Sequence, residues 1–272
     1  MIRAFVLSLL LWLPITAIYP QKIYVVAVGI ADYKEISDLR LTENDVDVFC
    51  QLMASQGAEI TTLTGSQATH VNVISALRSS FARATAHDTM IFFFSGHGYE
   101  GGFCCWDMSG ESPSISNSTV AQNVDDRSRL GVANRSFGGL SYQEMQILFR
   151  NCRAGKKLVF ADACYSGGLQ KGNQLNLSVQ SARNGDVAYM LSSQPEETSL
   201  EMAETTNGAF TYFLVKGLCG EADADGDGQI RLMEIYNYVA SNVAEYASSK
   251  SRNQHPVLWG KYDGSMTVFK TR

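Results

Sequence analysis

Residues 89–98, with the sequence TMIFFFSGHG, and residues 157–168, with the sequence KLVFADACYSGG, decide the fold. Each stretch opens with a short, continuous apolar run, which predicts a strand that is buried on both faces. Each run then changes abruptly to small and polar residues. Strands of this kind belong to parallel sheets, in which sites form beyond the carboxyl ends of the strands. The two polar clusters are therefore predicted to lie at the functional site.

The rest of the chain continues this pattern. Further strands are predicted at residues 22–29, 59–63, 187–192 and 265–269, and helices at residues 44–55, 69–84, 141–152, 210–219 and 232–246. Thr69 and Ser141 are expected to cap their helices, the second in a capping box with Glu144. Strands that alternate with helices of this length predict an α/β fold with a mostly parallel central sheet of about six strands and helices on both faces.

Length and charge set limits on the number of domains and on the partners. The 272 residues are enough for one substantial domain, predicted at residues 21–272. The polar stretches at residues 101–139 and 169–185 have no periodicity and are predicted to be a long loop and a linker. The formal net charge is −5, and no basic block exceeds a pair such as Lys156 and Lys157. This balance argues against a nucleic-acid partner, because phosphates require clustered basic residues.

Residues 1–20 have the pattern of a secretory signal peptide. Arg3 precedes an apolar run that Pro14 interrupts and that is too short to span a bilayer comfortably as a helix. We therefore expect no stable membrane span in the mature chain and a secreted or periplasmic location. An uncleaved membrane anchor or a buried first strand is the alternative.

The six cysteines do not form a disulfide or zinc pattern. They are scattered, no CxxC pair occurs, and a domain of this size does not need covalent links for stability. Cys50, Cys152 and Cys219 are predicted to be small buried apolar residues. The adjacent Cys104 and Cys105 are expected to pack in the interior. A vicinal pair or a second thiol near the site is the alternative for these two.

Cys164 is the exception, because its surroundings suit a catalytic nucleophile. Such a thiol needs a base within reach and main-chain N–H groups for the oxyanion. His97, between Gly96 and Gly98, and Cys164, before further glycines, each follow a buried strand. If these strands are neighbours, imidazole and thiol face each other, and the imidazole favours formation of the thiolate.

These motifs carry a family resemblance. SGHG followed by DACYSGG resembles the catalytic motifs of caspase-like cysteine peptidases, and is most similar to those of metacaspases and their bacterial relatives. The similarity spans about residues 22–269 and includes residues 28–30 with Tyr33, Asn44–Asp45, residues 192–194, and residues 208–211. It implies a cysteine endopeptidase in which His97 and Cys164 form the dyad. The N–H groups of Gly98 and Cys164 would form the oxyanion hole.

The resemblance also implies a substrate class. Metacaspase-like enzymes cleave after Arg or Lys because acidic side chains line the pocket, and the matching residues are Asp45 and Asp162, with Ser95 at the pocket edge. The expected partners are proteins or peptides with a basic P1 residue. Alternatively, Asp45 caps its helix and Asp162 accepts hydrogen bonds from loop amides. Lys171 and Arg183 in the predicted linker are candidate positions for self-cleavage.

Residues 223–234, DADGDGQIRLME, match the twelve-residue EF-hand template. Asp223, Asp225 and Asp227 occupy positions 1, 3 and 5, Gln229 offers its carbonyl at position 7, and Glu234 ends the loop. The pattern predicts a weak structural Ca²⁺ site, which the peptidase chemistry itself does not need. Arg231 is unfavourable at position 9, and an Asp/Gly turn that caps the next helix is the alternative.

Two other functions fit parts of the sequence. One is a catalytically silent caspase-like binding protein, with Ca²⁺ dependence as a variant of it. The presence of both His97 and Cys164 argues against this hypothesis. The other is a different cysteine peptidase with the same fold, such as the clostripain type, which also prefers Arg and uses the same kind of catalytic site.

Overall fold

The computed structural model describes residues 21–99, 101–109, 138–164, 187–194, 197–202 and 204–271. The predicted signal peptide, the linker at residues 169–185, and the candidate cleavage positions Lys171 and Arg183 lie outside the described residues. Within the described ranges, no helix has both the length and the apolar character needed to cross a membrane.

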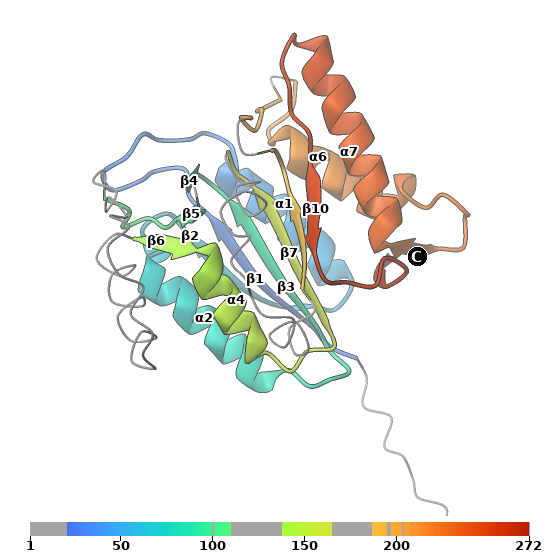
Figure 1. Cartoon of the computed structure of the whole chain (residues 1–272), viewed down its shortest axis with the longest axis horizontal. Helices are drawn as coiled ribbons and strands as arrows, with labels where there is room; N and C mark the ends of the chain where they lie inside the picture. Colours follow the sequence, from blue (N-terminus) through green and yellow to red (C-terminus); the bar gives the residue numbers. More distant parts are fainter. Residues whose placement is uncertain are drawn as a thin grey trace, which may run out of the picture.

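A six-stranded sheet forms the centre of the molecule (Figure 1). Its strands lie side by side in the order β10, β8, β7, β3, β1, β2, and all neighbours pair in parallel except β10 and β8. This confirms the predicted α/β class with a mostly parallel sheet. The strands are β1 (Ile23–Gly29), β2 (Glu59–Thr64), β3 (Thr89–Ser95), β7 (Lys156–Asp162), β8 (Ala188–Leu191) and β10 (Val257–Gly260).

Alternate residues of the central strands pack on opposite faces of the sheet. Along β3, Phe92 and Phe94 lie in one apolar core, whereas Ile91 and Phe93 lie in the other. All four side chains are almost completely buried. Burial on both faces is the reason why the sequence of β3 is a continuous apolar run instead of an alternating one.

Helices cover both faces. On one face α2 (His70–Arg83) and α4 (Tyr142–Arg150) pack beside each other, as Figure 1 shows. On the other face lie α1 (Thr42–Ser55), α6 (Ala209–Lys216), which continues into the π-helical turn η3 (Gly217–Glu221), and α7 (Leu232–Ser249). Both predicted caps are confirmed: the Asn72 N–H donates to Thr69 Oγ1 at 3.3 Å, and the Glu144 N–H donates to Ser141 Oγ at 3.1 Å.

The structure differs from the sequence-based prediction in its smaller sheets. The predicted final strand at residues 265–269 corresponds to β11 (Thr267–Lys270), but it pairs with β9 (Gln229–Arg231) outside the central sheet. The sixth central strand is instead β10. The stretch predicted to be a loop contains β5 (Gly102–Cys104) and reaches β6 (Gly139–Ser141), and both form a three-stranded sheet with β4 (Gly98–Tyr99). A short 3₁₀ turn, η1 (Gly65–Gln67), follows β2.

All six cysteines are free thiols. Cys152, Cys104 and Cys105 are buried, as predicted. The prediction was wrong for Cys219, which is exposed, and Cys50 is only half-buried. Cys219 lies in η3, whose buried residues are Gly217 and Leu218, so its side chain falls on the outer side of that turn.

Candidate active site

The two sequence motifs lie next to each other, because β3 and β7 are neighbours in the sheet. Ser95 pairs in register with Asp162, and the Gly96 N–H donates to the Asp162 carbonyl at 3.1 Å. Just beyond the strand ends, a Cβ atom built on Gly98 would lie 2.1 Å from the carbonyl oxygen of Cys164. Only a residue without a side chain permits this contact, so the main chain after His97 touches that of Cys164.

The main chain of His97 is fixed by three hydrogen bonds in a closed ring. Its N–H donates to the hydroxyl of Tyr33 at 2.8 Å, and that hydroxyl donates to the carbonyl of Cys104 at 3.3 Å. The Cys104 N–H in turn donates to the carbonyl of His97 at 2.9 Å. The Tyr33 ring also packs on the imidazole, with 5.1 Å between ring centroids. Burial raises the pKa of Tyr33 well above its usual value, so the phenol stays protonated and keeps both bonds.

The imidazole tautomer follows from its partner. His97 Nε2 lies 2.8 Å from the carbonyl oxygen of Ser37 and 3.4 Å from its hydroxyl. A carbonyl oxygen only accepts hydrogen bonds, so Nε2 carries the proton in this interaction. Nδ1 therefore holds the lone pair and is the basic atom of the ring. The structure thus supplies an orienting group that holds the base in one tautomer.

Cys164 is half-buried at the end of β7. Burial raises the pKa of its thiol above the usual value, the N–H of Ser199 lowers it, and the negative charge of Asp162 raises it again. A hydrogen bond from its own main-chain N–H also lowers this pKa. Because the net effect favours the neutral thiol, Cys164 needs a base to become a nucleophile.

The residues predicted for the substrate pocket form one buried cluster. Asp45 Oδ2 accepts from the Ser95 hydroxyl at 2.8 Å, and its Oδ1 accepts from Asn207 Nδ2 and the Gly208 N–H, each at 3.0 Å. A Cβ atom on Gly208 would lie 2.3 Å from Asp162 Oδ2 and 3.3 Å from Asp45 Oδ2, so both carboxyl groups border the same glycine.

Asp162 is held from the other side of the cluster. The N–H and hydroxyl of Thr211 donate to its Oδ2 at 3.1 and 3.0 Å, and the Ser199 hydroxyl donates to its Oδ1. The alternative interpretation of Asp162 was acceptance from loop amides, whereas the amide observed belongs to Thr211 in the first turn of α6. For Asp45, no side-chain cap is present at the start of α1, so the helix-cap alternative is wrong.

Burial makes ionisation of both carboxyl groups costly. Burial raises the pKa of Asp45 to about 8, the charge of Asp162 adds to this effect, and the hydrogen bonds from Asn207, Ser95 and Gly208 oppose it. Burial likewise raises the pKa of Asp162 against the hydrogen bonds from Ser199 and Thr211. The pair thus retains a proton near neutral pH, and a cation placed between the two groups would displace it.

Residues 22–262 match the model of the caspase domain family, Peptidase_C14. The chain belongs to this family. The match covers most of the chain and includes every residue of the His97 and Cys164 site. The family is one of cysteine peptidases, but its match does not distinguish metacaspases from other caspase-domain proteins.

The comparison with solved structures agrees at the level of the fold. Protein GSU0716 from Geobacter sulfurreducens, a structural genomics target, superimposes with a TM-score of 0.60 at 18% sequence identity. The match covers 92% of this chain and 99% of that chain. Among curated proteins, none matches this chain.

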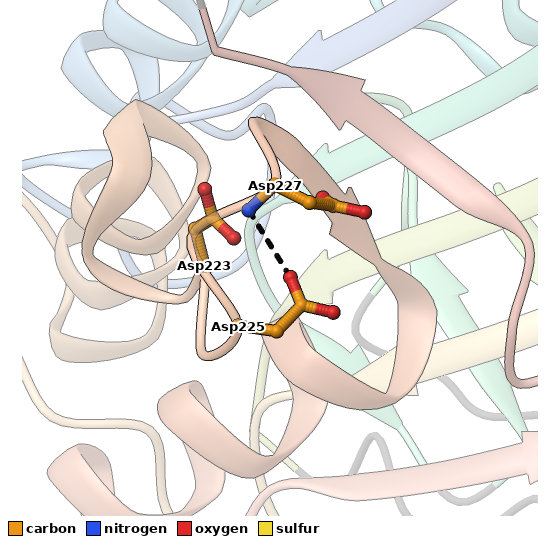
Figure 2. A group of neighbouring side chains, drawn as sticks. All are labelled: Asp223, Asp225 and Asp227. Carbon is orange, nitrogen blue, oxygen red and sulfur yellow. Dashed lines mark hydrogen bonds between the residues drawn. The ribbon is translucent and has the colours of Figure 1, made fainter.

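In this caspase domain, the first EF-hand-like residues, Asp223, Asp225 and Asp227, lie in the turn before β9, whereas Gln229 lies in β9 and Glu234 in the first turn of α7. One carboxylate oxygen from each of Asp223, Asp225 and Asp227 lies within 4.8 Å of the other two, and Figure 2 shows the three side chains around one turn. The Gly228 N–H donates to Asp223 at 2.9 Å, and the Asp227 N–H donates to Asp225 at 3.2 Å. The first half of the loop therefore fits the oxygen ligands that Ca²⁺ prefers.

The second half of the loop has other partners. The Arg231 guanidinium lies 3.2 Å from Asp225 and 2.5 Å from Asp227. Glu234 Oε2 accepts the Arg231 N–H at 2.8 Å, and the Gln229 side chain contacts Asp227 and Thr267. Of the five predicted ligands, the structure thus brings Asp223, Asp225 and Asp227 together, whereas Glu234 contacts Arg231 and is not part of that group, and an internal cation competes for two of the three.

Sequence reasoning missed several residues of the site. The carbonyl of Ser37 orients His97. Every residue has a main-chain carbonyl, so the type of residue at position 37 gave no signal of this role. Asn207 and Ser199 help to hold the two carboxyl groups and were not foreseen, and Thr211 was noted only as part of the motif at residues 208–211. Tyr33 was noted as part of the resemblance, but its bond to the His97 N–H was not foreseen.

Proposed function

We propose that this protein is a metacaspase-type cysteine endopeptidase that hydrolyses peptide bonds after Arg or Lys. The observation that carries the proposal is the arrangement of His97: its Nε2–H bonds to the Ser37 carbonyl, and the main chain beyond it touches Cys164. An oriented base and a half-buried thiol, carried by main-chain segments that touch, are the minimal machinery for covalent catalysis.

The chemistry follows from these groups. His97 Nδ1 takes the thiol proton of Cys164, and the sulfur attacks the scissile carbonyl to form a tetrahedral intermediate. The N–H groups of Gly98 and Cys164 stabilise its oxyanion. The imidazolium then protonates the leaving amine, and a water molecule, deprotonated by His97, hydrolyses the thioester and regenerates the thiol.

The carboxyl pair supports the preference for a basic P1 residue. Asp45 and Asp162 border Gly208 and are both buried, so a guanidinium gains more from a carboxylate there than it would in water. The same pair would repel an acidic P1 side chain. Binding of Arg or Lys would replace the proton that the pair holds.

A fluorogenic P1 peptide library tests the proposal. Wild type should cleave Arg and Lys peptides at least about 100-fold faster than Asp peptides, and both Cys164→Ala and His97→Ala should abolish cleavage. Asp47→Asn, an exposed change on the same helix as Asp45, serves as a control with unchanged rates. If no peptide is cleaved in a Cys164-dependent manner, the silent binding protein is the better account. If Asp peptides are preferred, the pocket assignment fails.

The proposal extends to location and maturation. The pattern of residues 1–20 supports export to the exterior or the periplasm, and Lys171 and Arg183 meet the P1 preference for self-cleavage. Mass spectrometry of the chain after prolonged incubation tests self-cleavage. A Cys164-dependent cut after either residue supports self-cleavage, and an intact wild-type chain contradicts it.

We also propose weak Ca²⁺ binding at the loop of Asp223, Asp225 and Asp227. The convergence of the three carboxylates supports it, with affinity limited by Arg231 to roughly the 10⁻⁴–10⁻³ M range of extracellular sites. Titration calorimetry of wild type against Asp225→Ala tests this proposal. Heat that is absent at millimolar Ca²⁺, or identical in the variant, contradicts it.

A further inference from the structure

Ser192, the residue directly after β8, forms hydrogen bonds with the main chain of Ala163, the residue just before the nucleophile. The Ala163 N–H donates to Ser192 Oγ at 3.0 Å, and the same hydroxyl donates to the Ala163 carbonyl at 2.9 Å. The Ser192 N–H donates to the Ala161 carbonyl at 2.9 Å, which continues the ladder of β8 with β7. Ser192 is fully buried, so water does not replace these bonds.

The bond to the Ala163 carbonyl matters because of peptide geometry. The carbonyl of Ala163 and the N–H of Cys164 belong to one planar trans peptide group, in which they point in opposite directions. A donor that holds the carbonyl therefore fixes the direction of the N–H. It also polarises the peptide group, since hydrogen bonds in a chain strengthen one another.

We propose that Ser192 is a positioning residue that orients and polarises the Cys164 N–H for stabilisation of the oxyanion. This inference rests on the proposed peptidase function. Ser192 touches neither the sulfur nor the substrate in this account, and acts only through the peptide group between Ala163 and Cys164. Its effect is therefore confined to steps in which negative charge develops on the substrate oxygen.

Ser192 is itself held from the other side. The fully buried side chain of Gln254 donates through Nε2 to the Ser192 carbonyl at 3.0 Å and to Ser199 Oγ at 3.1 Å. Its Oε1 accepts the Leu200 N–H at 2.9 Å. The hydroxyl of Ser192 is thus part of a rigid, satisfied network, as the precise orientation of a catalytic N–H requires.

The neighbouring Ser193 offers a matched control. It is equally buried, but its hydroxyl lies 3.5 Å from the Ala163 carbonyl, farther than that of Ser192, and 3.3 Å from the carbonyl of Glu197. Ser193→Ala removes the same atom from the adjacent position. We expect it to change catalysis much less than Ser192→Ala does.

Two reactions of Cys164 separate an oxyanion effect from a general loss of structure. Alkylation by iodoacetamide needs a competent thiol but forms no oxyanion, whereas a peptide aldehyde with Arg at P1 forms a tetrahedral adduct that needs one. We expect Ser192→Ala to reduce kcat and aldehyde affinity by about 10-fold or more, with KM and alkylation rate within about 2-fold of wild type.

Ser192→Ala leaves buried groups unsatisfied and could lower activity through misfolding. A second pair of variants separates that effect from the loss of the hydroxyl. Ser192→Thr keeps the hydroxyl, and Ser192→Val replaces it with a methyl group of equal size. The proposal predicts tighter aldehyde binding and higher kcat for Thr than for Val, at equal alkylation rates. Equal aldehyde affinity in this pair, with wild type active, overturns it. A wild type without Cys164-dependent turnover instead refutes the peptidase function.

Discussion

His97 Nε2 lies 2.8 Å from the carbonyl oxygen of Ser37 and 3.4 Å from its hydroxyl. The first distance is that of a good hydrogen bond and the second is at the limit. The main chain of Ser37, and not its side chain, therefore orients the base.

Ser37→Ala tests this assignment. Because the carbonyl stays in place, we expect kcat/KM to remain within about 3-fold of wild type. Steady-state kinetics with an Arg peptide provides the measurement. A loss of more than about 10-fold would show that the hydroxyl, and not the carbonyl, is the partner of the imidazole.

Tyr33→Phe removes the hydroxyl that links His97 to Cys104. The ring still packs on the imidazole, but the His97 N–H loses its acceptor and the Cys104 carbonyl loses a donor. We expect an unfolding free energy lower by about 1–2 kcal/mol and a kcat lower by about 10-fold. Urea denaturation and kinetics on the same preparation measure both. Unchanged kcat in a destabilised variant would limit Tyr33 to a structural role.

Asp45→Asn should make the protein more stable at alkaline pH. Folding raises the pKa of Asp45 to about 8, so the folded state holds this proton more tightly than the unfolded chain. The stability that this contributes is fully present below pH ~4 and is lost as pH rises to about 8. Asparagine carries no charge to be ionised, and its amide can accept from Asn207 and Gly208 while it donates to Ser95.

The melting temperatures of wild type and Asp45→Asn at pH 5 and pH 8.5 measure this effect. The variant should become more stable relative to wild type between pH 5 and pH 8.5, and its unfolding free energy should exceed that of wild type by on the order of 2 kcal/mol at pH 8.5. Its cleavage of Arg peptides should be slower than that of wild type. Asp47→Asn, exposed on the same helix, should show no such trend. A variant that becomes less stable relative to wild type as pH rises would refute the buried, proton-holding pair.

Arg231→Gln should strengthen Ca²⁺ binding. Its guanidinium pairs with Asp225 and Asp227, and these hydrogen bonds lower the pKa of Asp227. Removal of the internal cation leaves these carboxylates for the metal, so calorimetry should give an affinity about 3- to 10-fold higher than that of wild type. Weaker or unchanged binding would show that Arg231 does not compete for the loop.

The parts of the fold that could be predicted from the sequence are those with a strong local cause. The runs at β1, β3 and β7 are apolar on both faces of the sheet, and this double burial is visible as a continuous pattern. The position of His97 and Cys164 followed from two strand ends. The capping side chains of Thr69 and Ser141 could also be predicted from the sequence, because a cap is a local interaction.

The remainder depends on contacts between distant segments. The strand β10 is four residues long and follows Pro256 directly, so nothing in VLWG distinguishes it from a loop until β8 pairs with it. The contacts of Ser37 with His97 and of Gln254 with Ser192 join residues about 60 positions apart. Such contacts are set by the tertiary fold, and the periodicity of the sequence does not predict them.

The account depends most on the identity of the reacting sulfur. Burial raises the pKa of Cys104 to about 12 and that of Cys105 well above its usual value, so neither competes as a nucleophile. Intact-mass and peptide mapping after treatment with a peptidyl acyloxymethyl ketone bearing Arg at P1 tests the claim directly. We predict a single adduct on Cys164, absent from Cys164→Ala and strongly slowed in His97→Ala. An adduct on another cysteine together with retained peptidase activity, or labelling that is indifferent to His97, would contradict the proposed dyad.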